Sequence, residues 1–268
     1  MDFYLREDLD EKGDITSDSI FSDEEGKAQI IAKEQCIIAG LEEAEKVFKR
    51  LGASMEKKTE DGREVKKGEV VATVSGRLRS ILTGERLALN FICRMSGIAT
   101  ETRKLVKICN KINPNVKIAA TRKTTPGFRK FEKKAVEIGG GIPHRFGLYD
   151  AVLIKDNHIA GVGSITEAIN KVKNKVKGKV IEVEAQNEKD AIQAAYSNVD
   201  VIMLDNFKPE KAEKVTQKIK QINPNILIEV SGGINAENIN RYASFADRIS
   251  LGYITHSVKS KDFSLEII

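Results

Sequence analysis

One short segment, residues 122–158, holds most of the side chains that could bind an anionic substrate. It reads R-K-T-T-P-G-F-R at its start, continues with G-G-G-I-P-H-R and ends with L-I-K-D-N-H. Arg binds carboxylates and phosphates through a planar pair of donors, and Lys adds a point charge. Such a density of cations among glycines and prolines predicts a pocket for a substrate with several negative charges. The cationic and imidazole side chains of the segment are Arg122, Lys123, Arg129, Lys133, Lys134, His144, Arg145, Lys155 and His158.

Two of these lysines also allow a simpler interpretation. Lys133 and Lys134 belong to a polar stretch, and Lys side chains are mostly exposed, so a solvated basic surface also accounts for them. This interpretation does not extend to Lys155, because that residue follows the apolar run A-V-L-I at 151–154. Such a run is typical of a buried strand. We therefore expect Lys155 to emerge from the core where a strand ends.

The elements that must position these residues follow an α/β rhythm in the second half of the chain. Short runs rich in β-branched residues predict strands at 116–121, 151–154, 180–183, 201–204, 226–230 and 248–251. Helices are predicted between the later strands: one capped by Ser164, one at 188–196, one from Pro209 to 222, and one at about 236–243. The alternation indicates a parallel sheet. Six strands are too few for a regular eight-stranded barrel, so we favour an open α/β barrel, with a doubly wound sheet as the alternative.

The residues that follow these strands are polar, charged or glycine at every strand end. In barrel enzymes the active site lies at the carboxyl ends of the strands, so these residues are expected to surround one mouth. The last two ends carry glycines, which let backbone N–H groups approach a phosphate. An ordinary turn between strand and helix also accounts for residues 231–233. The strand ends are Arg122-Lys123, Lys155-Asp156-Asn157, Glu184, Asp205-Asn206, Ser231-Gly232-Gly233 and Gly252.

The first half of the chain has a different pattern. We expect strands at 28–32 and 70–74, a helix at about 41–51, a hairpin at 61–71 and a long helix at 83–112 with a possible break at Gly97. Thr83 is the predicted N-cap of the long helix, which places Arg86 in its first turn. A cation there opposes the helix dipole. Arg86 is therefore expected to contact an anion, or else to form a surface salt bridge with Glu85 or Asp61.

The composition excludes several classes of protein. The 268 residues suit one large or two ordinary domains, and the formal net charge of +5 is too small for a nucleic-acid-binding signature. Cys36, Cys93 and Cys109 form no C-x-x-C pair, which is typical of reduced thiols in a cytoplasmic protein. The chain is charged from Asp2 onward, so we expect no signal peptide. No apolar run approaches the roughly 20 residues that span a bilayer.

Taken together, the motifs resemble those of the quinolinate phosphoribosyltransferase family, and the resemblance runs nearly end to end. One departure is Ala120, where many members carry Asp, but the basic residues beside it are intact. The motifs are G-D-I-T-S at 13–17, E-R-L-A-L-N-F-I-C-R-M-S-G-I-A-T at 85–100, T-R-K-T-T-P-G-F-R at 121–129, G-G-G-I-P-H-R-F-G-L-Y-D at 139–150, L-I-K-D-N-H at 153–158, E-V-E at 182–184, I-M-L-D-N at 202–206, E-V-S-G-G-I at 229–234 and T-H-S at 255–257.

The resemblance implies a fold and a reaction. The fold is an N-terminal α/β sandwich domain, expected at 1–103, followed by an incomplete α/β barrel at 104–257 and a tail at 258–268 that returns to the first domain. The implied reaction converts quinolinate and phosphoribosyl pyrophosphate, with Mg²⁺, into nicotinate mononucleotide, pyrophosphate and CO₂ in the synthesis of NAD. Family members form homodimers, with a hexamer of dimers as a further option, and each active site is completed by the partner subunit.

The same resemblance assigns expected roles to individual residues. Lys123, Lys155, Glu184 and Asp205 are expected to act in catalysis, and the two acidic residues are expected to hold Mg²⁺ through water or ribose hydroxyls. His158 remains open between a catalytic role and a brace for the loop after Lys155. The expected substrate-binding residues are Arg86 from the partner subunit, Thr121, Arg122, Lys123, His144, Arg145, Lys155, Glu184, Asp205, Ser231, Gly232, Gly233, Leu251, Gly252, Tyr253 and His256.

Three other functions fit parts of the sequence. A paralogue of the same family, associated with molybdenum transport genes, departs from the K-D-N-H motif that is intact here at 155–158. A Schiff-base aldolase would use Lys155 as its amine, but would leave Arg122 and Arg145 without a role. A nucleic-acid-binding protein would use the lysines at 171–179, which we expect to form the solvated face of a helix.

Overall fold

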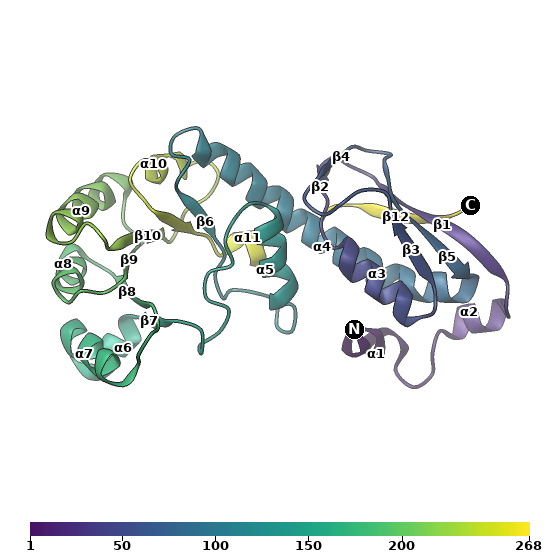
Figure 1. Cartoon of the computed structure of the whole chain (residues 1–268), viewed down its shortest axis with the longest axis horizontal. Helices are drawn as coiled ribbons and strands as arrows, with labels where there is room; N and C mark the ends of the chain where they lie inside the picture. The colour runs from purple at the N-terminus through teal and green to yellow at the C-terminus, as the bar shows by residue number, and fades with distance from the viewer. The chain divides into compact units, whose positions relative to one another are not determined.

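The computed structural model describes all residues, Met1–Ile268. The chain divides into two compact units (Figure 1). Unit 1 comprises Met1–Arg103, Lys130–Gly140 and Ser257–Ile268, and unit 2 comprises Lys104–Arg129 and Gly141–His256. The first segment of unit 1 ends at Arg103, and its last segment begins at Ser257. Residues Lys130–Gly140 also pack in unit 1, although they fall inside the range expected for the barrel.

Unit 2 is built on a six-stranded sheet in which every pair of neighbours is parallel. The strand order is β6-β11-β10-β9-β8-β7. The first strand of the unit therefore lies beside its last, as it does in a barrel, and the sheet stays open between β6 and β7. This order confirms the incomplete barrel and rules out the doubly wound alternative. The strands are β6 Lys117–Ala119, β7 Val152–Ile154, β8 Ile181–Ala185, β9 Val201–Asp205, β10 Leu227–Ser231 and β11 Arg248–Ser250.

Side-chain alternation along these strands decides what faces the centre of unit 2. All five residues of β8 are buried, although two of them, Glu182 and Glu184, are acidic. Because successive side chains in a strand point to opposite faces, both glutamates share one face while Val183 lies on the other. A parallel sheet is covered on both faces and is normally apolar throughout. Paired acids in its interior therefore indicate a polar centre inside the open barrel.

Helices cover the sheet of unit 2, and α7, α8 and α9 pack side by side along it (Figure 1). Ser164 caps α7 as predicted, since its hydroxyl accepts the Glu167 N–H at 3.2 Å. The predicted helices at 188–196 and 209–222 are confirmed to the residue, whereas the one at 236–243 is helical only in its last turn. The helices are α6 Asp156–Val162, α7 Ile165–Lys175, α8 Glu188–Tyr196, α9 Pro209–Ile222, α10 Asn240–Ala243 and α11 Tyr253–His256.

Unit 1 contains a four-stranded antiparallel sheet in the order β12-β1-β5-β3 and a small pair, β2-β4. The hairpin predicted at 61–71 is wrong: β4 pairs with β2, and β5 pairs with β1 and β3. The last strand, β12, lies at the sheet edge against β1, as the returning tail required. The strands are β1 Glu25–Ala32, β2 Cys36–Ile37, β3 Ser54–Lys57, β4 Glu64–Val65, β5 Val70–Arg77 and β12 Phe263–Ile267.

Five helices have all or most of their residues in unit 1, and α4 continues from it into unit 2. The predicted long helix is present but starts earlier, at Leu78, so Arg86 lies inside it and Thr83 does not cap it. The hydroxyl of Thr83 instead donates to Asp14 Oδ2 at 3.0 Å. The dipole argument for Arg86 is therefore wrong. The helices are α1 Asp2–Leu9, α2 Ile15–Ile20, α3 Leu41–Arg50, α4 Leu78–Asn110 and α5 Arg129–Ile138.

Gly97 does not break α4, which runs unbroken for 33 residues. A Cβ atom at Gly97 would lie 2.5 Å from the backbone oxygen of Lys259. The glycine therefore allows the returning tail to lie against the helix within unit 1. Neither α4 nor any other helix has an apolar stretch of the length needed to cross a membrane.

Candidate active site

A cavity of about 820 Å³ lies where the strands of unit 2 end at their carboxyl sides. It collects every predicted site residue of the barrel, whereas Arg86 belongs to unit 1 and is not among the residues that line it. The predicted residues along the cavity are Thr121, Arg122, Lys123, His144, Arg145, Lys155, Glu184, Asp205, Ser231, Gly232, Gly233, Leu251, Gly252, Tyr253 and His256. Residues without an expected role also line it: Ala120, Leu153, Asp156, Asn157, Met203, Asn206, Glu229, Ile234 and Ser250.

Three cations of the cavity form no ion pair within the chain. The Nε atom of Arg122 is buried and has no hydrogen-bond partner. Arg145 contacts only the backbone oxygen of Ala151, at 3.4 Å, and Lys123 contributes only backbone groups to hydrogen bonds. Burial lowers the pKa of Arg145, and the nearby charge of Arg122 lowers it further. Two guanidinium groups held this close without a counter-ion form a site prepared for an anion.

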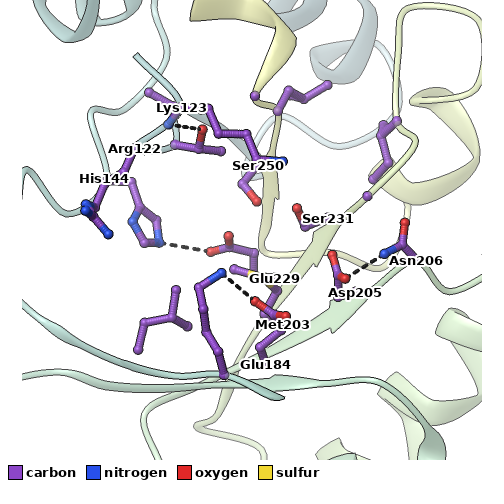
Figure 2. Close-up of a pocket in the computed structure, with 18 of the residues that line it drawn as sticks. Arg122, Lys123, His144, Glu184, Met203, Asp205, Asn206, Glu229, Ser231 and Ser250 are labelled. Atoms are coloured by element: carbon purple, nitrogen blue, oxygen red, sulfur yellow. Dashed lines mark hydrogen bonds and ion pairs between the residues drawn. The ribbon is translucent and has the colours of Figure 1, made fainter. Parts of the chain in front are cut away.

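The acidic residues lie in another part of the cavity and are already engaged (Figure 2). Lys155 Nζ donates to Glu184 Oε2 at 2.9 Å. The side-chain amide of Gln186 donates to Glu184 Oε1 at 2.9 Å and to Asp205 Oδ2 at 3.4 Å, so it bridges the two carboxylates. Asn206 donates to Asp205 Oδ2 at 2.6 Å. Two carboxylates joined in this way offer oxygen ligands of the kind that Mg²⁺ prefers, with room for water or substrate oxygens.

Glycines at the ends of β10 and β11 let other groups pack closely against the backbone. Gly232 and Gly233 have φ angles of 86° and 63°, in the left-handed region that favours glycine. A Cβ atom at Gly232 would lie 2.2 Å from Asn206 Oδ1, and one at Gly252 would lie 2.9 Å from Lys123 Cδ, so these two side chains occupy the space beside the glycines. A Cβ atom at Gly233 would meet nothing within 4 Å, so the backbone there is open, as a phosphate site needs.

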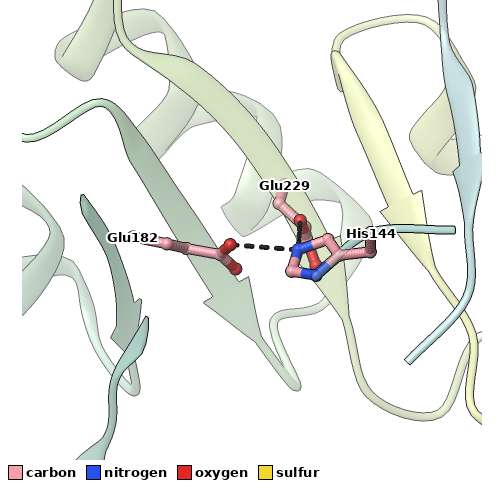
Figure 3. Close-up of side chains that lie close together, drawn as sticks. All are labelled: His144, Glu182 and Glu229. Carbon is pink, nitrogen blue, oxygen red and sulfur yellow. Dashed lines mark hydrogen bonds and ion pairs between the residues drawn. The ribbon is translucent and has the colours of Figure 1, made fainter. Parts of the chain in front are cut away.

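His144 turns its imidazole toward buried acids beneath the cavity (Figure 3). Its Nε2 atom lies 3.0 Å from Glu182 Oε2 and 3.3 Å from Glu229 Oε2, and Arg248 pairs with both carboxylates. Burial alone would lower the pKa of His144, but the hydrogen bonds that the ring donates to Glu182 and Glu229 outweigh it and raise the pKa to about 9. The Nδ1 atom faces the backbone, where the N–H of Arg145 donates to it at 2.7 Å. The imidazole is therefore held at both nitrogens, by the glutamates at Nε2 and by the backbone at Nδ1.

The cluster of His144, Glu182 and Glu229 has the ligand types of a metal site, with atoms within 4.8 Å of one another. Arg248 already occupies the side of both carboxylates that a cation would need. Burial raises the pKa of Glu182, whereas Arg248 and His144 outweigh burial at Glu229 and lower its pKa. The chain's own cations therefore neutralise these acids, and Glu184 with Asp205 fits Mg²⁺ better.

The remaining polar residues of the cationic segment brace loops or lie elsewhere. The backbone N–H of Lys155 donates to His158 Nδ1 at 3.0 Å, which favours the bracing role for His158. Arg129 links Thr124 Oγ1, at 3.0 Å, to the backbone oxygen of Phe146, at 3.2 Å. Lys133 is buried in unit 1, and Lys134 pairs with Glu42 and Glu43 there. These two lysines therefore belong neither to the cavity nor to a solvated basic surface.

Two contributors to the site, Gln186 and Glu229, received no role from the sequence. Gln186 follows Glu184 by two positions, and Glu229 precedes Ser231 by two. The two-residue period of a strand places each on the same face as a residue that was predicted. The alternation of side chains along the strands therefore indicated both residues, but the prediction considered only residues at the strand ends.

Two family models match the chain and together cover almost all of it. The model described as "Quinolinate phosphoribosyl transferase, N-terminal domain" matches residues 14–96, and the one described as "Quinolinate phosphoribosyl transferase, C-terminal domain" matches residues 98–266. The first match falls within unit 1, and the second includes every residue that lines the cavity.

Individual relatives agree with these models. A probable carboxylating nicotinate-nucleotide pyrophosphorylase of Archaeoglobus fulgidus is 44% identical over 96% of this chain and 98% of its own length. One from Bacillus subtilis is also 44% identical, over 95% of this chain and 88% of its own. The solved structure of the nicotinate-nucleotide pyrophosphorylase from Francisella tularensis is 38% identical, with a TM-score of 0.92 over 100% of this chain and 94% of that one. With an unpaired cationic cluster and a bridged acid pair at the mouth of an open barrel, this chain belongs to the quinolinate phosphoribosyltransferase family.

Proposed function

We infer that the chain transfers the phosphoribosyl group of phosphoribosyl pyrophosphate to quinolinate with decarboxylation, giving nicotinate mononucleotide, pyrophosphate and CO₂ for NAD synthesis. The observation that carries this inference is the division of one cavity into two chemically different parts. Unpaired cations gather in one part, and the acid pair Glu184 and Asp205 lies in the other. The relatives named above carry the description "carboxylating" in their names.

The unpaired cations suit the pyridine substrate. Quinolinate has two adjacent carboxylates, and each is matched by a guanidinium fork better than by a single ammonium. Arg122 and Arg145 provide two such guanidinium groups. The repulsion between their charges favours the binding of an anion. His144 lines the same cavity next to Arg145. We assign these three side chains to quinolinate, together with Thr121 and Lys123 beside them.

The acid pair suits the ribose. When the C1′–O bond to pyrophosphate breaks, positive charge develops on the sugar, and Glu184 with Asp205 stabilises it. Lys123 and Lys155 receive the negative charge of the leaving pyrophosphate. The ring nitrogen of quinolinate then forms the new bond to C1′. The resulting cationic ring accepts the electron pair of the breaking carbon–carboxylate bond, CO₂ leaves, and solvent supplies the proton that replaces it.

The 5′-phosphate and the metal complete the assignment. Backbone groups of residues 231–233 and 251–253, with His256, would hold the 5′-phosphate, and the open backbone at Gly233 leaves room for it. Mg²⁺ would be held by Glu184 and Asp205, through water or ribose hydroxyls, and supplies counter-charge to the pyrophosphate when bound. Loss of turnover on chelation, restored by added Mg²⁺, is the expected result.

We further propose that the chain acts as a homodimer and that Arg86 of each subunit serves the partner's cavity. Arg86 is exposed, has no ion-pair partner, and lies outside unit 2. The resemblance to the family assigns it to substrate binding in the partner's cavity. The reduced cysteines also support a cytoplasmic location, since all three are free.

The deciding experiment supplies purified protein with quinolinate labelled at its 2-carboxylate, phosphoribosyl pyrophosphate and Mg²⁺. Released CO₂ and nicotinate mononucleotide are measured together. Product that requires all three components is the expected result. A folded protein that binds quinolinate but releases no CO₂ would contradict the proposed function.

A further inference from the structure

The cluster of Glu182, Glu229 and Arg248 has no role in the chemistry derived above. Its members come from β8, β10 and β11, each two positions before a residue that lines the cavity. His144 reaches down to it from the loop after Gly141 (Figure 3). Glu229 thus lines the cavity itself, whereas Glu182 and Arg248 do not, and one imidazole connects these three residues to Arg145.

The burial of this cluster costs free energy that its contacts only partly offset. Glu182 is 2% exposed and Glu229 is 0% exposed. Each carboxylate uses its Oε2 atom for both His144 and Arg248, while its Oε1 atom is buried without any partner. A buried carboxylate oxygen without a partner is destabilising, and an apolar layer would serve stability at least as well. The arrangement is explained better by the position it imposes on His144 than by stability.

The backbone of His144 needs such a constraint. Its φ angle is 54°, in the left-handed region that is uncommon for residues other than Gly, although His adopts it more often than most, as Asn and Asp do. This conformation costs free energy and persists only where surrounding contacts hold it. The imidazole held between Glu182 and Glu229 supplies those contacts. The next residue along the same backbone is Arg145, whose guanidinium lines the cavity beside Arg122.

We propose that Glu182, Glu229 and Arg248 act as positioning residues that lock the His144–Arg145 turn and thereby set the affinity for the dicarboxylate substrate. This inference rests on the proposed function, because it assigns the turn to quinolinate. The two glutamates contact His144, and Arg248 pairs with both of them. Glu184 and Asp205 are held by other side chains, those of Lys155, Gln186 and Asn206. Disturbing the cluster should therefore weaken binding of one substrate and not of the other.

The test compares three variants with a matched control. Glu229→Gln and Glu182→Gln keep side-chain volume and remove one carboxylate each. His144→Asn removes the imidazole but keeps a residue type that tolerates positive φ. The control is Asp247→Asn, which removes a carboxylate next to Arg248 that accepts from the Ile228 N–H at 2.8 Å and from Lys220 at 3.0 Å, and that does not line the cavity.

Two readouts separate positioning from general stability. We expect KM for quinolinate to rise about tenfold or more in each cluster variant, the scale of one hydrogen bond to a charged group, while KM for phosphoribosyl pyrophosphate changes less than about twofold. The Kd of benzene-1,2-dicarboxylate, which keeps both carboxylates and lacks the attacking nitrogen, should rise in parallel. Asp247→Asn should lower the melting temperature without changing either KM.

Other outcomes would overturn the inference. Equal changes in both KM values, or unchanged KM and Kd in variants that fold, would make the cluster a purely structural layer. If Glu229→Gln does not fold, Glu182→Gln carries the test, since Glu182 does not line the cavity and is less completely buried; His144→Asn gives the size of the effect when the imidazole itself is lost. Turnover by the unaltered enzyme tests the proposed function separately. Loss of the positioning role would leave that turnover intact, whereas an incorrect proposed function would abolish it.

Discussion

At the scale of single residues, partners within the chain distinguish a prepared binding group from a structural one. Arg122 and Arg145 have no counter-ion, whereas Lys134, from the same cationic segment, pairs with Glu42 and Glu43. Residue type alone did not separate these cases. The residue types of the site could be predicted from the sequence. Which of its cations remain unpaired could not, because that depends on where the strands and loops place them.

Replacing Lys155 with Ala tests the residue that contacts the acid pair. Turnover should fall by about 10²-fold or more, as is typical when a donor to developing charge is removed. Folding should persist, because the Lys155 side chain is 43% exposed and such ion pairs contribute little to stability. Steady-state rates and melting temperature are measured together, with Lys171→Ala, which breaks the exposed pair to Glu167, as the control. Full activity in Lys155→Ala would remove this residue from the mechanism.

The raised pKa of His144 gives a stability prediction with a definite sign. A group whose pKa rises on folding stabilises the native state fully below its unfolded pKa, about 6.5 for His. That contribution is lost as the pH rises through about 9. The stability advantage of the wild type over His144→Asn should therefore shrink between these pH values. Urea unfolding at a series of pH values measures it, and an advantage that grows with pH would contradict the charged ring.

At the scale of elements, local signals predicted those helices and strands whose ends carry a chemical marker. Pro209 marks the start of α9, and Ser164 caps α7. The hairpin at 61–71 failed because turn residues specify a change of direction and not the pairing partner: β4 found β2 through contacts distant in sequence. The start of α4 was missed because the helix begins at Leu78, directly after β5. Thr83, which was expected to cap the helix, lies inside it and donates to Asp14 instead.

Gly97 in α4 provides a test of packing between elements. Gly97→Ala should destabilise the protein by about 1–3 kcal/mol, because its Cβ would overlap the Lys259 backbone oxygen and force the tail away. Gly161 in α6 is the matched control, since it is exposed and a Cβ there meets nothing within 4 Å. Alanine at that position should leave stability unchanged or slightly higher. Denaturant unfolding measures the free energy of unfolding of both variants and of the wild type. If Gly97→Ala is as stable as Gly161→Ala, the tail adapts to the added Cβ without cost.

At the scale of the whole molecule, Arg86 is the residue that a single cavity does not explain. It was singled out for the wrong reason, since it lies within α4 and not in its first turn. The resemblance to the family nevertheless keeps its assignment to the partner's site. The assignment therefore stays a prediction that rests on the sequence motif and not on the position of Arg86 in the helix.

Subunit mixing tests this assignment. Arg86→Ala and Lys155→Ala should each be nearly inactive alone, but a mixed dimer contains one site with both native residues. Random re-association should restore roughly a quarter of wild-type activity, because half of the dimers are mixed and each has one intact site. Mixing Lys155→Ala with Asp205→Ala, whose defects lie in the same cavity, should restore nothing. Absence of recovery in the first mixture would place Arg86 outside the shared site.

The pairing of β12 with β1 has a consequence for the order in which the protein is made. Residues 263–267 complete a sheet whose neighbouring strand occupies residues 25–32, and Phe263 is buried in unit 1. During synthesis most of unit 1 emerges from the ribosome first. Its sheet nevertheless lacks β12, and α4 lacks the segment that packs against Gly97, until residues 257–268 have been made. Unit 2 is fully translated before that tail is available and can fold ahead of it. The unit whose synthesis begins first is therefore the last to complete its sheet.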